Sequence, residues 1–181
     1  MKHAIIVHGR PSKQQFYDPG LPSTSNYYWI PWLQKQLALN SMPSQAPEVP
    51  NAWDPHYPTW KSTFEVYAYS KDTVLVGHSC GAGFIVRWLS ENPDLVVGKV
   101  VLLAPWFDPA GDPENEHTQD FFDFELDSDL VERTGGVTII HSSNDVETIQ
   151  TSTRALRSKL TGTKYIELKD RKHFYDENSM E

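Results

Sequence analysis

The chain has 181 residues, a formal net charge of −8 at pH 7 and one cysteine. That length suits a single domain with a substantial core, and the negative charge argues against nucleic acid or an anionic membrane as the main partner. One cysteine cannot form an intramolecular disulfide, and the apolar run Ala4 to Val7 is too short for a signal peptide or a membrane span. We therefore expect a cytoplasmic protein with one domain over residues 1–181.

Short apolar runs rich in β-branched residues alternate along the chain with segments of helical apolar spacing. Strands are predicted at 3–7, 44–46, 73–76, 99–103, 137–141 and 163–168, and helices at 27–39, 59–68, 81–92 and 148–160. Pro31 is compatible with the first of these helices only within its first turn. Because parallel strands need crossover connections, the alternation predicts a three-layer α/β fold with a parallel sheet of about six strands.

The motif that is most informative about chemistry is the pentapeptide Gly-His-Ser-Cys-Gly at 77–81. It follows a predicted strand and precedes a predicted helix. In such a turn the two glycines let the strand reverse sharply, and the serine is held in strained backbone geometry with its hydroxyl exposed. Ser79 is therefore the candidate nucleophile, and the backbone N–H of Cys80 is a candidate donor to an oxyanion.

A serine nucleophile needs a base, and the base needs an orienting acid; in folds of this kind the acid precedes the base along the chain. Asp145 lies in a loop of turn-forming residues directly after the strand at 137–141. His173 follows the strand at 163–168. Because functional groups gather at the carboxyl ends of parallel strands, Asp145 and His173 are the candidate acid and base for Ser79.

Other residues compete for these roles. Asp170 and Asp176 are rivals of Asp145, although both lie close to His173 along the chain. The other histidines fit structural or solvated positions better, and none has a metal-ligand spacing: His3, His8, His56, His78, His117 and His141. We expect neither a metal nor a cofactor.

The segment at 105–132 is strongly acidic. The chain has no lysine or arginine between Lys99 and Arg133. In that stretch it carries ten carboxylates: Asp108, Asp112, Glu114, Glu116, Asp120, Asp123, Glu125, Asp127, Asp129 and Glu132. A solvated insertion is the simpler interpretation. The alternative is an acidic cap over the site, which would favour neutral or cationic substrates over anionic ones.

Taken together, several short motifs resemble the small α/β-hydrolase family of retinoblastoma-binding protein nine and the YdeN-like bacterial proteins. The resemblance covers nearly the whole chain. Its motifs are Ile5-Ile6-Val7-His8-Gly9, the Trp-x-x-Trp-Leu-x-x-x-Leu pattern at 29–37, Ala46-Pro47-Glu48-Val49-Pro50, the pentapeptide at 77–81, Leu103-Ala104-Pro105-Trp106, Ser143-Asn144-Asp145 and Lys172-His173-Phe174.

The resemblance implies a single-domain α/β-hydrolase with strand order 2-1-3-4-5-6, in which the three candidates above form a catalytic triad. It also implies that the backbone amides of Cys80 and Arg10 bind the oxyanion, and it marks His8 and Trp106 as candidate substrate-binding residues. The chain departs from the family pattern at Asn144, where the family has a second acid.

Two further departures concern whole segments. Residues 11–23 look like an insertion, and the long helix that follows the His-Phe pair in the family has no counterpart here. We expect residues 174–181 to be too short to bury an apolar stripe. A shortened or truncated chain would then leave an apolar sheet face beside Ile166 and Leu168, open or covered by a second copy or another partner.

These features predict a carboxylesterase-like serine hydrolase that cleaves a small ester through an acyl-enzyme on Ser79. The alternative is a catalytically idle protein that keeps the scaffold for protein–protein interaction. Nucleotide binding by 77–83 is disfavoured because the Lys-Ser or Lys-Thr ending of a phosphate loop is missing.

Overall fold

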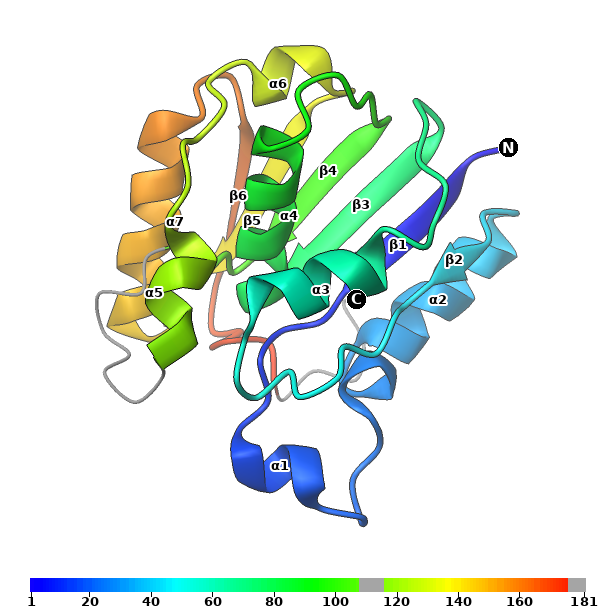
Figure 1. The fold of residues 1–181 in the computed structure, drawn as a ribbon, viewed down its shortest axis with the longest axis vertical. Helices are drawn as coiled ribbons and strands as arrows, with labels where there is room; N and C mark the ends of the chain where they lie inside the picture. The colour runs from blue at the N-terminus through cyan, green and yellow to red at the C-terminus, as the bar shows by residue number, and fades with distance from the viewer. Residues whose placement is uncertain (108–115, 176–181) are drawn as a thin grey trace.

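Six short parallel strands form the centre of the molecule, as Figure 1 shows for the computed structural model, which describes residues 1–107 and 116–175. The strands are β1 (His3–Val7), β2 (Ser44–Gln45), β3 (Thr73–His78), β4 (Lys99–Leu103), β5 (Val137–Ser142) and β6 (Lys164–Leu168). They pair in the order β2-β1-β3-β4-β5-β6, and every pair is parallel. The predicted α/β class, strand order and parallel sense are confirmed.

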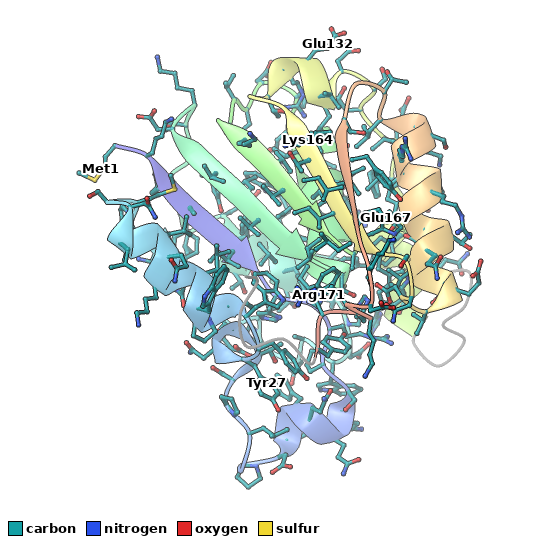
Figure 2. All side chains as sticks on the ribbon, turned by 180° about the vertical axis from the view of Figure 1, so that it is seen from behind. Met1, Tyr27, Glu132, Lys164, Glu167 and Arg171 are labelled. Carbon is teal, nitrogen blue, oxygen red and sulfur yellow. The ribbon has the colours of Figure 1, made fainter. Side chains whose placement is uncertain are left out.

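Seven helices connect the described strands: α1 (Lys13–Tyr17), α2 (Ile30–Leu39), α3 (Tyr57–Phe64), α4 (Cys80–Ser90), α5 (Glu116–Phe122), α6 (Leu130–Arg133) and α7 (Glu147–Lys159). A 3-10 turn at Thr24–Asn26 precedes α2. Figure 1 shows α3 and α4 in front of the sheet, and α7 packs against β5 on that side. Seen from behind in Figure 2, the ribbons of β3 to β5 have no described helix in front of them.

The two faces of the sheet differ accordingly in burial. Ile139 and Leu102 point to the helix-covered face and are fully buried. Their neighbours Ile140 and Val101 point to the opposite face and are only half-buried, because side chains alternate along a strand. Ile166 shares the second face through its register with Ile140, and it too is half-buried.

An aromatic cluster holds α4 against its neighbours. Phe84 of α4 packs edge to face on Phe64 of α3, with ring centroids 5.1 Å apart, and Trp60 meets Phe121 of α5 at 5.4 Å in the same orientation. Aromatic pairs prefer this arrangement and contribute stability beyond the apolar area they bury. The cluster therefore fixes the position of α4 and of the turn that precedes it.

Helix boundaries differ from the sequence-based expectation where local backbone geometry intervenes. The helix predicted at 27–39 begins only at Ile30, because Tyr28 has a φ of 53° that is incompatible with a helix. Pro31 lies in the first turn, as expected. The helix predicted at 59–68 spans Tyr57–Phe64 instead. The short helices α1, α5 and α6 were not predicted, because four to seven residues give too little periodicity.

The described part of the acidic segment packs beside α4. Phe121 and Phe122 are buried, and the Arg87 guanidinium donates hydrogen bonds to the carbonyls of Asp120 and Phe121. Asp127 forms an ion pair with Arg133. Three of the ten acids, Asp108, Asp112 and Glu114, lie outside the described residues.

After His173 the structure describes the chain as far as Tyr175. Phe174 is fully buried in the core, and the expectation that residues 174–181 bury no apolar stripe stays a prediction. Residues 176–181 lie outside the described residues. Within the described ranges, no helix combines the length and the apolar character that crossing a membrane requires.

Candidate active site

Ser79 lies at the sharp turn between β3 and α4. Its φ of 52° and ψ of −119° place it in a strained region for a residue with a side chain. The turn is held because the Ser79 N–H donates to the Leu103 carbonyl at 2.9 Å, while the Ser79 carbonyl accepts from the Trp106 N–H at 3.1 Å. Ser79 as a whole is 4% exposed. The strained backbone was predicted from the sequence.

The glycines on either side of Ser79 are required by close contact. A Cβ atom on Gly77 would lie 2.6 Å from the Ala82 Cα, and one on Gly81 would lie 2.3 Å from the His8 carbonyl oxygen. Both distances are shorter than any real contact, and the obstructing atoms are backbone atoms that cannot move aside. The Gly-X-Ser-X-Gly pattern is therefore a packing requirement of this turn.

Ser79, His173 and Asp145 form one continuous hydrogen-bonded chain. The Ser79 hydroxyl lies 2.9 Å from His173 Nε2, and His173 Nδ1 lies 2.9 and 3.0 Å from the two carboxylate oxygens of Asp145. The carboxylate can only accept, so Nδ1 carries the proton and Nε2 is the acceptor for the serine hydroxyl. The arrangement matches the nucleophile, base and acid geometry that the sequence motifs predicted.

The loops that carry Asp145 and His173 are joined to each other. Asn144 Oδ1 accepts a hydrogen bond from the Ser142 hydroxyl and another from the Lys172 N–H, each at 2.8 Å. The Arg171 N–H donates to Ser142 Oγ at 2.9 Å. The Asp145 side chain is fully buried, and its Oδ1 also accepts from the Val146 N–H. Asn144, where the family has an acid, thus ties the acid loop to the base loop without adding a charge.

The loop around His173 stores backbone strain. Asp170, Lys172 and Phe174 all have positive φ values, of 57°, 47° and 61°. Each costs a non-glycine residue about 1–3 kcal/mol, so such geometry persists only where surrounding contacts impose it. The bonds to Ser142 and Asn144 are contacts of that kind. They hold His173 toward Ser79 rather than toward solvent.

His78, the residue before the nucleophile, supports the base from the other side. Its Nε2–H donates to the backbone carbonyl of His173 at 3.0 Å, and the two imidazole rings are 5.0 Å apart. Burial, together with the nearby His173, holds the pKa of His78 well below its usual value. His78 is therefore neutral at physiological pH, and it keeps the tautomer that donates to His173.

His8 and Arg10 lie beside the nucleophile at the end of β1. His8 is 1% exposed; its Nδ1–H donates to the Gly9 carbonyl at 2.7 Å, and its Nε2 accepts from the Val49 N–H at 3.1 Å. Burial lowers the pKa of His8, consistent with this neutral tautomer. Both nitrogens are thus used by the backbone, which holds the ring in place. The substrate-binding role of His8 stays a prediction.

The bond from His8 also orients the candidate oxyanion donor. In a trans peptide the N–H points opposite to the preceding carbonyl, and this structure has no cis peptide among its described residues. Fixing the Gly9 carbonyl therefore fixes the direction of the Arg10 N–H. The other candidate donor, Cys80, is the first residue of α4, where an N–H has no partner within the helix. Both roles remain predictions.

Trp106 forms part of the wall near Ser79. Besides its backbone bond to Ser79, its ring lies under the Arg10 guanidinium at 4.8 Å and packs on Phe122 at 5.3 Å. The described residues contain no cluster of three or more ligating side chains suited to a metal ion. The site is therefore built from a serine, a histidine and a buried carboxylate, with aromatic side chains around them.

Sequence reasoning did not find the support residues His78, Asn144 and Tyr175. Their roles depend on contacts between loops that lie far apart in the sequence. His78 could have been noticed as a histidine inside the elbow motif, and Asn144 as the departure next to the acid. Nothing in the sequence marked Tyr175, whose ring lies 4.7 Å from that of His173.

Comparison with known proteins supports the geometric interpretation. A family model described as serine hydrolase matches residues 17–180. The chain belongs to the serine hydrolase family. The family resemblance that the sequence motifs indicated is thereby confirmed. A comparison with curated protein sequences found no significant match.

Solved structures share the fold of this serine hydrolase at low sequence identity. The ydeN gene product of B. subtilis is 21% identical with a TM-score of 0.80, over 99% of this chain and 93% of that one. Est1E from Butyrivibrio proteoclasticus is 16% identical with a TM-score of 0.66, over 97% and 81%. An esterase domain from Rhodothermus marinus is 14% identical with a TM-score of 0.67, over 98% and 80%.

Proposed function

We propose that this serine hydrolase cleaves small carboxylic esters through an acyl-enzyme formed on Ser79. The observation that carries the proposal is the continuous hydrogen-bonded chain from the Ser79 hydroxyl through His173 to the buried Asp145. A neighbour described as an esterase domain shares the fold and supports the ester as the substrate class. A serine hydroxyl alone is a weak nucleophile, and this chain provides the base that activates it.

The reaction follows from the roles of the three side chains. Ser79 Oγ attacks the ester carbonyl carbon while its proton passes to His173 Nε2, and the negative charge develops on the carbonyl oxygen. The amides of Cys80 and Arg10 would bind that oxygen. As the tetrahedral intermediate collapses, His173 returns the proton to the leaving alkoxide, which departs as an alcohol. Asp145 keeps the imidazole oriented and stabilises its cationic form.

A water molecule then completes the cycle. His173 removes a proton from the water as the oxygen attacks the acyl carbon, and the second tetrahedral intermediate releases Ser79 with its proton restored. The product is a carboxylic acid. Each step uses only groups of this chain and water.

The test compares the wild type with Ser79→Ala and with Ser158→Ala, which removes an exposed serine hydroxyl on α7. We expect Ser79→Ala to lose about a thousandfold or more of kcat on p-nitrophenyl acetate, because the group that forms the acyl-enzyme is gone. Ser158→Ala keeps wild-type turnover. An intact mass increase equal to one acetyl group during turnover should appear in the wild type only.

An outcome in which Ser79→Ala retains ester hydrolysis would assign the activity to another site. A folded wild type that turns over no ester in a panel of increasing acyl length would instead favour the idle scaffold of the alternative interpretation.

A further inference from the structure

A pocket with four aromatic side chains in its walls opens beside the active-site loops, and the proposed reaction does not use it. The space that water-sized molecules can occupy is about 30 Å³, within about 480 Å³ between the side chains that includes open solvent, and the four aromatic residues are Tyr27, Tyr28, Trp29 and Tyr175. We infer that this pocket, called the aromatic pocket below, binds a planar aromatic group of the ester. The inference rests on the proposed function and names the substrate class for the same site.

The position of the aromatic pocket is set by the active-site loops. Gly9, Arg10 and His78 line it. A Cβ atom built on Gly9 would lie 3.1 Å from the Ser79 Cβ, so Gly9 packs directly against the nucleophile. Tyr175 lines the same space, and its ring contacts that of His173. The aromatic pocket therefore lies beside two members of the triad.

The aromatic walls form a connected series of rings. Tyr27 and Tyr28 stack with ring centroids 3.9 Å apart and planes inclined by 21°. Tyr28 and Tyr175 are 5.2 Å apart with planes inclined by 32°. Nearly parallel rings present flat faces, and such faces attract another aromatic ring more strongly than a saturated group of equal area. Figure 2 shows Tyr27 beyond the arrowheads of the strands, at the end of the molecule where the active site lies.

The rings are held in place before any substrate arrives. Tyr28 has a φ of 53°, a conformation that an aromatic residue adopts only under constraint. Gln15 of α1 donates a hydrogen bond to the Tyr28 hydroxyl at 3.3 Å. Glu48 accepts from the N–H groups of Thr24 and Ser25, which fixes the turn before Tyr27. A rigid pocket loses little entropy when it binds a rigid ring.

The charge of the pocket disfavours a cationic ring. Among its described lining residues, Arg10 is the one with a permanent charge, and its guanidinium lies over the Trp106 ring. His8 and His78 also line it, and the pKa of each is lowered by burial, so both are neutral. Arg10 therefore disfavours a cationic group in the aromatic pocket.

The experiment measures kcat/KM for two matched pairs of esters. Methyl phenylacetate and methyl cyclohexylacetate place a ring on the acyl side, while benzyl acetate and cyclohexylmethyl acetate place it on the alcohol side. In each pair the carbon skeleton is the same and only the aromatic character changes. We expect the aromatic ester to be preferred about threefold to tenfold in one pair. The pair that shows the preference identifies which half of the ester enters the pocket.

Two variants connect the preference to the rings. Tyr27→Leu and Tyr28→Leu remove flat faces but keep apolar volume, so we expect the ratio of the aromatic to the saturated kcat/KM to fall to about one. Tyr17→Leu is the matched control, because Tyr17 is an exposed tyrosine of α1 that does not line the pocket. A preference unchanged in both pocket variants, or equal rates within both wild-type pairs, would overturn the inference.

A binding measurement separates this inference from the proposed function. Ser79→Ala cannot form an acyl-enzyme, yet it keeps the pocket, so phenylacetate and benzyl alcohol can be titrated into it and followed by NMR. We expect one of them to shift the tyrosine ring signals, and to bind more tightly than its cyclohexyl counterpart. If no ester is hydrolysed but the ring binds, the proposed function fails and the pocket stands. If esters are hydrolysed but neither ring binds preferentially, the pocket assignment fails.

Discussion

At the scale of single residues, His78 shows how the site depends on a buried neutral imidazole. It donates from Nε2 to the His173 backbone, and the groups that face it are His173, His8, Trp29 and Tyr175. Its pKa lies well below the reference value of 6.5 because burial disfavours the charged form. The unfolded chain therefore binds this proton more readily than the folded chain does.

This difference predicts a pH-dependent stability. The contribution of His78 is fully present above pH 6.5 and is lost as the pH falls below it, by up to about 1.4 kcal/mol per pH unit. Urea titrations at pH 7.5 and 5.5 measure how far the unfolding free energy falls between the two pH values. We expect the fall to be about 1 kcal/mol larger in the wild type than in His78→Gln. Glutamine does not titrate, and its amide can still donate to His173. Equal losses in the two proteins would show that folding does not lower the pKa of His78.

Residue types and chain order made the three triad members predictable, because each follows a separate strand of a parallel sheet. The burial of Ser79 and the contacts of His78 and Asn144 were not predictable in the same way. They depend on how the loops after β1, β3, β5 and β6 meet, and that is fixed by tertiary packing rather than by local pattern.

At the scale of elements, β5 has one buried face and one open face. Ile139 and Ile140 are adjacent residues of the same type, yet Ile139 is fully buried while Ile140 is half-buried on the open side. Sequence patterning located the strands well, because apolar β-branched runs identify them. It predicted an open apolar face at β6, beside Ile166, and the half-buried Ile140 extends that face to β5.

The adjacent pair provides an internally controlled prediction. We expect Ile139→Ala to lower the unfolding free energy by about 2–5 kcal/mol, since it leaves a cavity between the sheet and its helices. Ile140→Ala should cost about 1 kcal/mol, because much of its side chain already meets solvent. Urea denaturation at pH 7.5 measures both. Similar costs for the two substitutions would mean that the second face is covered in solution.

At the scale of the whole molecule, the strand order and the α/β class could be predicted because alternation of strands and helices leaves few topologies.

The sequence also predicted an open apolar sheet face at β6. In the structure Val101, Ile140 and Ile166 lie on that face, and all three are half-buried. A second copy or another partner over this face remains a prediction. Light scattering of the wild type and of Ile166→Lys tests it. An oligomer in the wild type that dissociates in the variant supports the prediction, and a monomeric wild type contradicts self-association.

Covalent labelling by a fluorophosphonate shows whether Ser79 is an activated nucleophile. Cleavage after Lys71 and Arg87 yields a peptide in which Ser79 is the only serine, so mass spectrometry can locate the adduct. We expect stoichiometric labelling of that peptide in the wild type at pH 7.5. In His173→Ala, which lacks the base, labelling should be at least about a hundredfold slower. A folded wild type that resists the reagent, or equal labelling rates with and without His173, would mean that His173 does not activate Ser79.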